Sequence, residues 1–82
     1  MSLMPRYYLH LRDEFTDTLE PEGKETPLEA VARTALLAAR DCMAGDVRDG
    51  RLDLRYRIDV HDERSKLVHS LAFADALVIT TE

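Results

Sequence analysis

Three segments of the chain alternate between apolar and polar residues, which is the pattern of strands with one buried face. They are residues 6–12, 53–61 and 66–73. Their apolar positions are Tyr7, Leu9, Leu11, Leu54, Tyr56, Ile58, Val60, Leu67, Leu71 and Phe73. The polar residues 62–65 predict a hairpin turn between the last two segments. A weaker alternation through Phe15, Asp17 and Leu19 predicts one further short strand.

Residues 26–44 predict a single amphipathic helix. Thr26 and Glu29 have the spacing of a capping box, and Pro27 occupies the first helical position. Gly45 can adopt the left-handed conformation that ends a helix, so we expect the helix to stop near Ala44. The stripe that we expect to face the core is Leu28, Val31, Ala32, Ala35, Leu36, Ala39, Cys42 and Met43.

The order strand, weak strand, helix, strand, strand predicts an α+β domain. In this fold class one helix packs on one face of a small, mainly antiparallel sheet, here of about three or four strands. We expect residues 4–82 to form a single domain and residues 1–3, which precede a second methionine, to be a cloning leader. Residues 74–79 fit either a helical turn begun by Asp75 or a last edge strand.

Length and composition narrow the function classes. A chain of 82 residues is expected to hold one core, without a second domain or a deep cofactor cleft. Its one cysteine excludes an intrachain disulfide and a multi-cysteine zinc site, which favours a reducing cytoplasm. The net charge of −5 argues against a surface that binds nucleic acid throughout. No apolar run reaches the roughly 18 residues of a membrane-spanning helix.

The residues that could carry chemistry lack the spacing of a catalytic or metal site. His10 and His61 are expected on the polar face of the sheet and His69 on its apolar face, without an H-E-x-x-H or C-x-x-C pairing. Cys42 lies near the predicted helix end, where the helix dipole raises the pKa of a thiol, so we expect a buried structural thiol. The sequence therefore predicts no catalytic residue, no metal and no cofactor.

Two surfaces are candidate binding sites. Small residues around one leucine on the outward side of the helix can pack helix against helix, and self-association would also cover an open sheet edge. Aromatic and arginine side chains on an open sheet are the groups with which proteins bind single-stranded RNA, although Asp53 and Asp59 can pair with these arginines instead. The candidate self-association residues are Ala30, Thr34, Leu37 and Ala38. The candidate nucleic-acid residues are Tyr8, Arg12, Arg55 and Arg57.

The leading expectation is a non-enzymatic interaction domain in the cytoplasm whose partner is a second copy of the chain or another protein. Nucleic-acid binding through the exposed sheet face is the alternative. No membrane partner and no small-molecule substrate is indicated by the sequence.

Five short motifs are spread over most of residues 4–79: MPRYY (4–8), LRD (11–13), EG (22–23), LEA (28–30) and FADA (73–76). In these motifs the chain resembles the DUF6894 family, short bacterial proteins of unknown function that are frequent in rhizobia and related proteobacteria. The resemblance implies a bacterial, cytoplasmic protein and supplies no catalytic residues. The family commonly has glycine after the aspartate of the first strand and in the later hairpin turn, where this chain has Glu14 and residues 62–65.

Overall fold

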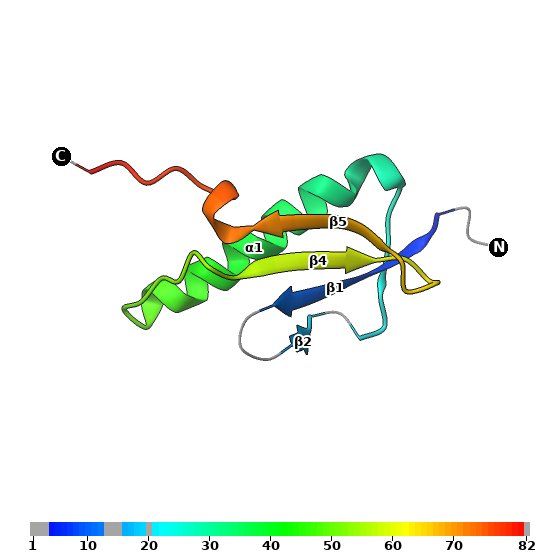
Figure 1. Ribbon diagram of the computed structural model, residues 1–82, viewed down its shortest axis with the longest axis horizontal. Coiled ribbons are helices and arrows are strands. Elements are labelled where there is room, and N and C mark those ends of the chain that lie inside the picture. The colour runs from blue at the N-terminus through cyan, green and yellow to red at the C-terminus, as the bar shows by residue number, and fades with distance from the viewer. Residues whose placement is uncertain (1–3, 13–15, 20, 82) are drawn as a thin grey trace.

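The computed structural model describes residues 4–12, 16–19 and 21–81. One long helix lies across one face of an antiparallel sheet (Figure 1), so the expected α+β architecture is confirmed. Residues 1–3, the expected leader, and Phe15 of the weak strand lie outside the described residues. Within these ranges no helix is long and apolar enough to cross a membrane.

The sheet has the strand order β2-β1-β4-β5 with antiparallel neighbours throughout. β1 (Arg6–Arg12) and β4 (Arg57–His61) lie at its centre, and β5 (Leu67–Ala72) is an edge strand. The expected weak strand is present as β2 (Thr16–Thr18), which pairs with the end of β1. A fifth strand, β3 (Lys24–Glu25), pairs with the start of β1.

The strand β3 is missed by the alternation pattern because two residues are too few to show a period. Arg6 holds this segment against β1: its guanidinium donates to the carbonyl of Glu22 at 2.7 Å and pairs with Glu25 at 2.9 Å. Gly23, with φ +77°, lies so close that a Cβ there would be 2.5 Å from Arg6 and 2.9 Å from Tyr8. A glycine is therefore required where the loop crosses β1.

The buried faces of β1 and β4 are those that the alternation predicts. Tyr7 and Leu9 of β1 are 5% and 3% exposed, and Ile58 and Val60 of β4 are almost completely buried. Leu11 lies on the same side and packs against the core. Because successive side chains of a strand point to opposite faces, the alternate residues of both strands lie on the open face of the sheet.

β4 is shorter than predicted, because it begins at Arg57 instead of residue 53. The carboxylate of Asp53 accepts the backbone N–H of Arg55 at 3.0 Å, which closes a turn of the Asx type. This turn replaces the first residues of the expected strand. Leu54 and Tyr56 nevertheless pack against the core. Their side chains therefore lie on the buried side, as the alternation predicts.

The start of the helix differs from the capping-box prediction. Leu28–Ala30 form a 3₁₀ turn, and α1 (Val31–Arg48) follows it; neither helix start has a side-chain cap. The backbone N–H of Thr26 instead donates to the carbonyl of Pro5 at 3.1 Å, and Thr26 is buried. The pairing of β3 with β1 thus places Thr26 against the sheet, away from the helix cap position.

The end of the helix is also different, because α1 continues through Gly45 to Arg48. The residue with positive φ is Gly50, at +83°, and its N–H donates to the carbonyl of Val47 at 2.9 Å. A glycine inside a helix costs only about 1 kcal/mol.

The buried stripe of α1 is slightly rotated from the predicted one. Val31, Ala35, Ala39 and Met43 are buried as expected, and Leu36 and Cys42 are partly buried. Leu28 is 64% exposed because the tighter 3₁₀ turn takes it off the α-helical stripe, and Ala32 is exposed. Ala38 packs partly buried against the core instead, on the side of β1 and β2.

The hairpin turn at residues 62–65 is confirmed, with the carboxylate of Asp62 accepting the N–H groups of Arg64 and Lys66 at 2.9 Å. After β5 the chain makes a 3₁₀ turn, η2 (Phe73–Asp75). Of the two alternatives for residues 74–79, the helical turn is therefore correct, although it begins at Phe73. Phe73 is fully buried, and the chain beyond Ala76 is extended and leaves the sheet (Figure 1).

Replacement of either glycine near the helix end by alanine should change the stability of the protein, in opposite directions at the two positions. We expect Gly45→Ala to raise the free energy of unfolding by about 0.5–1 kcal/mol, because alanine has the higher helix propensity and nothing lies within 4 Å of its Cβ position. Gly50→Ala should lower it by about 1 kcal/mol, since its φ is +83°. Urea denaturation measures both, and a stabilising Gly50→Ala would contradict this helix end.

Candidate functional site

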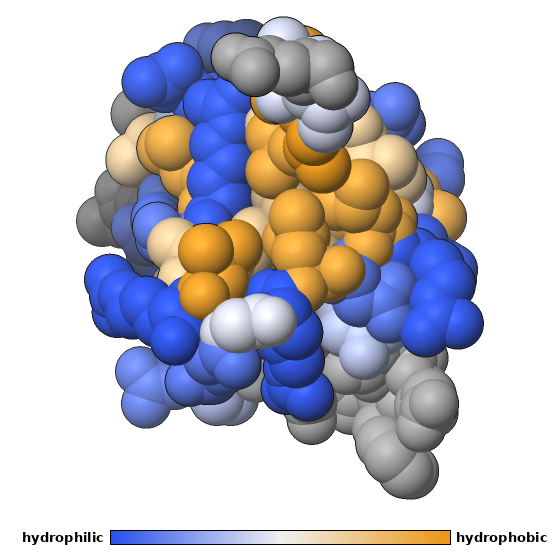
Figure 2. All heavy atoms as spheres, turned by 90° about the vertical axis from the view of Figure 1, so that its left-hand side faces the viewer, coloured by the Kyte–Doolittle hydropathy of each residue, from blue (hydrophilic) through white to orange (hydrophobic). Residues whose placement is uncertain are grey.

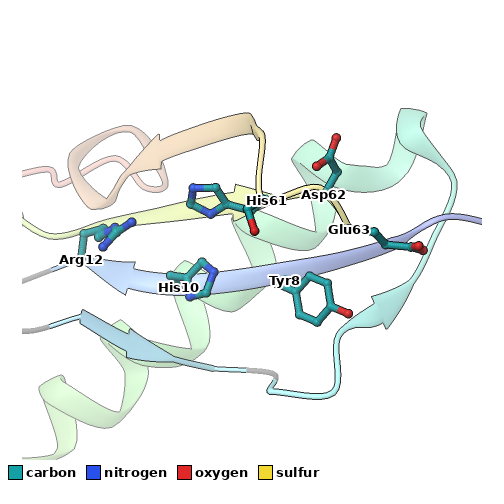
Figure 3. A pocket seen from close by; sticks show the side chains of 7 residues that line it. Tyr8, His10, Arg12, His61, Asp62 and Glu63 are labelled. Carbon is teal, nitrogen blue, oxygen red and sulfur yellow. The ribbon is translucent and has the colours of Figure 1, made fainter.

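A shallow hollow of about 430 Å³ lies on the open face of the sheet, where β1 and β4 meet the hairpin turn. Three of its side chains come from β1 and the others from the end of β4 and the turn (Figure 3). Alternation along two paired strands brings these residues to one face, since Tyr8 is opposite His61 and His10 is opposite Asp59. The lining residues are Tyr8, His10, Arg12, His61, Asp62, Glu63 and Ser65.

Two imidazoles lie in contact in this hollow. The rings of His10 and His61 have centroids 4.9 Å apart and meet edge to face at 67°. Burial lowers the pKa of His10, and the neighbouring His61 and Arg12 lower it further. Nδ1 of His61 is buried and has no hydrogen-bond partner among the described residues. The expected position of both histidines on the polar face is confirmed, and His69 lies in the other register position, opposite Val60.

A buried carboxylate organises the polar face next to this hollow. Asp59 is 4% exposed and accepts hydrogen bonds from Arg12 at 3.0 Å and Arg57 at 3.1 Å. The hydroxyl of Ser70 on β5 donates to the same carboxylate at 2.6 Å. Burial alone would raise the pKa of Asp59, but the hydrogen bonds from Ser70, Arg12 and Arg57 lower it below the ordinary value.

The candidate nucleic-acid residues are only partly brought together. Tyr8, Arg12 and Arg57 share the open face of the sheet, but Arg55 lies in the turn before β4 and pairs with Asp53 at 2.6 Å. Hydrogen bonds from Arg55 lower the pKa of Asp53 to about 2. The arginines therefore pair with the interleaved aspartates. Sequence reasoning did not single out Glu63 as part of this face.

Other reactive groups do not add a site to the described part of the chain. No group of three or more His, Cys, Asp or Glu side chains there could hold a metal ion. Cys42 is half-buried, and burial raises the pKa of its thiol, with smaller contributions from Asp46 and Asp41. The cause differs from the helix-dipole argument, because α1 ends six residues after Cys42 rather than two.

The candidate self-association residues lie on a flank of α1. Thr34, Leu37 and Ala38 line a groove of about 150 Å³ together with Leu9 and Leu19 of the sheet side. Leu37 is 46% exposed, while Ala38 packs partly buried on the core. Ala30 ends the 3₁₀ turn and does not line this groove. The set thus divides between the core, the groove and the helix start.

A larger apolar surface lies at the far end of α1. Figure 2 faces this end and shows hydrophobic atoms gathered in one patch beside hydrophilic side chains. We call the patch the end face; it encloses a hollow of about 440 Å³. Sequence reasoning missed it because it ended the helix at Ala44, which left Val47 in a loop. The lining residues are Arg40, Met43, Ala44, Val47, Leu52 and Leu77.

Asp59 predicts a pH-dependent contribution to stability. We expect Asp59→Asn to lower the free energy of unfolding at neutral pH by about 2–3 kcal/mol, because two guanidinium groups lose their charged acceptor. The folded-state pKa of Asp59 is lowered, so this stabilisation is present above the unfolded value of about 3.9 and is lost as the pH falls through the folded value. Denaturation of both proteins across this range measures it.

The matched control is Asp53→Asn, which removes an ion pair whose arginine side chain is 86% exposed. Exposed pairs contribute little, so this variant should lose much less stability than Asp59→Asn. Equal losses in the two variants would contradict the organising role of Asp59.

The histidine pair predicts a second pH dependence. Because the folded-state pKa of His10 is lowered, the unfolded chain binds this proton more readily, and stability should fall as the pH falls through about 6.5. His10→Gln should reduce this slope, and so should His61→Gln, which removes a neighbouring charge. Denaturation between about pH 5 and pH 8 measures the slopes; a His10→Gln slope as steep as that of the wild type would contradict the assignment.

Comparison with known proteins identifies a family but not an activity. The model of the DUF6894 family, a domain of unknown function, matches residues 6–74. This range includes all strands and the helix. No curated protein and no solved structure matches the chain. The matched range exceeds half of the 82 residues, and the protein therefore belongs to the DUF6894 family.

Proposed function

We propose that this protein is a small, non-enzymatic interaction domain that self-associates through the end face. The observation that carries the proposal is the apolar hollow lined by Met43, Ala44, Val47, Leu52 and Leu77, in which Val47 and Leu52 are exposed. Leu77 is the tail residue that lines it, and the next two residues of the tail, Val78 and Ile79, are 89% and 54% exposed. Soluble monomers seldom leave a large contiguous apolar patch in water, and such patches commonly mark interaction sites.

Burial of this surface would also supplement a thin core. Val47 is 58% and Leu52 is 37% exposed, and covering apolar surface contributes roughly 25 cal/mol per Å². The largest fully buried side chains are only Phe73, Ile58 and Val60. Arg40, which borders the end face, donates to the carbonyl of Ala76 at 2.8 Å and so fixes the start of the tail beside the helix. The apolar residues of helix and tail are therefore presented together.

The open sheet face supports the nucleic-acid alternative less well. Arg12 and Arg57 both donate to Asp59, so part of the positive charge that would attract phosphate is already offset. Asp62 and Glu63 also line the hollow beside the histidines. The hollow contains more carboxylates than arginines at neutral pH, which opposes binding of a polyanion. The same shallow, open shape favours a non-enzymatic role, because catalysis generally uses a site that excludes water.

We propose a bacterial cytoplasm as the setting. The raised pKa of the Cys42 thiol keeps it protonated and slow to oxidise, which suits a structural cysteine in a reducing compartment. The bacterial origin rests on the family resemblance, and no conclusion on chemistry depends on it.

If the end face is the dimer interface, one charged side chain introduced into it should disrupt the dimer. We expect light scattering at about 50 micromolar protein to give twice the mass of one chain, and Val47→Glu to give the monomer, because a carboxylate buried without a partner is costly. The matched control is Leu37→Glu on the flank of the same helix, which is 46% exposed and should leave the dimer intact. A monomeric wild type would contradict the proposal, and a dimer lost only in Leu37→Glu would move the interface to the flank groove.

A further inference from the structure

The tail of the chain has the composition of a strand but pairs with none of the strands that the structure describes. Residues 77–81 read LVITT, in which four of five residues are β-branched, and they are extended. β-branched residues have high strand propensity. In Figure 1 this segment leaves the molecule at its left-hand end instead of following the sheet. An extended, apolar segment in water lacks the ladder hydrogen bonds that would stabilise it.

β5 offers the complementary edge. Within the described residues β5 pairs with β4 alone. The backbone N–H and C=O groups of alternate β5 residues therefore point outward, away from β4. Natural edge strands are commonly protected by charged residues or proline. β5 reads LVHSLA and contains neither, and its Leu67 is 52% exposed. The opposite side of the sheet differs, since β3 consists of Lys24 and Glu25.

The tail is directed away from the β5 of its own chain. The turn η2 follows β5 directly, and Ala76 at its end is 2% exposed. The carbonyl of Ala76 accepts the hydrogen bond from Arg40 of α1 at 2.8 Å, which fixes the point at which the tail leaves the domain. To pair with its own edge strand, the tail would have to reverse at this anchored residue. The β5 strand of a second copy of the chain can pair with the tail without this reversal.

We propose that residues 77–81 of one copy form an additional antiparallel strand on β5 of a second copy, and that the exchange is reciprocal about a two-fold axis. The five tail residues match the length of the six-residue edge, and neither strand contains a charge that opposes pairing. Leu77 belongs to both the tail and the end face, so the two contacts are continuous. The inference rests on the proposed self-association and specifies its second contact.

The test uses a double proline variant, Val78→Pro/Ile79→Pro. Successive N–H groups of a strand point in opposite directions, so one of these two residues must donate to β5 in either register. Proline removes that donor while retaining an apolar side chain. We expect the dimer dissociation constant, measured by sedimentation, to rise at least about 100-fold. The matched control Val78→Ile/Ile79→Val keeps both donors and should dimerise like the wild type.

Amide hydrogen exchange of the full chain gives a second measurement. We expect alternate protection of amides within residues 77–81 in the wild-type dimer and none in the Val47→Glu monomer. Isotope-filtered NMR on mixed labelled and unlabelled chains should show contacts between the tail of one chain and β5 of the other.

The outcomes separate this inference from the proposed function. A wild-type dimer whose tail amides exchange freely and which survives the proline variant would overturn strand exchange while supporting the end face. Tail amides protected without any contact between chains would also overturn it, because the tail would then pair within its own copy. A monomeric wild type would overturn both proposals.

Discussion

The close packing of α1 on the inner face of β4 and β5 is the constraint on which the structure depends. Ala35 and Ala39 are completely buried, and their short side chains let the helix backbone approach the sheet closely. Ile58 of β4 is completely buried in the same core cluster. Because this single helix covers one face, each central strand has a buried side and a solvent side. The polar chemistry is confined to the open face, and apolar surface is left where the helix extends past the sheet.

On the open face, one carboxylate connects three strands. Asp59 of β4 binds Arg12 of β1 and Ser70 of β5, as well as Arg57 of its own strand. These contacts are directional, and they add to the register that the buried residues of the other face already favour. A shift in strand register by one residue would separate Asp59 from Arg12 of β1 and Ser70 of β5, so the polar face helps to specify the pairing that the core stabilises.

Periodicity in the sequence was enough to predict the fold class and most of the core, but not the ends of the elements. Alternation correctly placed Leu9 and Val60 on the buried face because strand geometry depends on local steps. The helix ends depended on distant contacts: Thr26 pairs with Pro5, and Gly45 is carried within a helix stabilised by packing. The end face could not be predicted for this reason, since Val47 becomes helical only when α1 passes Gly45. Arg55 was misplaced by a local side-chain turn that competes with the strand.

The pairing of β1 with β4 joins residues from opposite ends of the chain, such as Tyr8 and His61. Such pairing requires a long loop to close, and the entropy cost of closure comes before the contacts that offset it. Folding is therefore slower than that of a helical protein of equal size. During synthesis α1 can begin to form locally, but β1 has no central neighbour until β4 has been translated. The nascent chain therefore carries an incompletely paired first strand until β4 and β5 have emerged from the ribosome, and only then can it complete its native sheet.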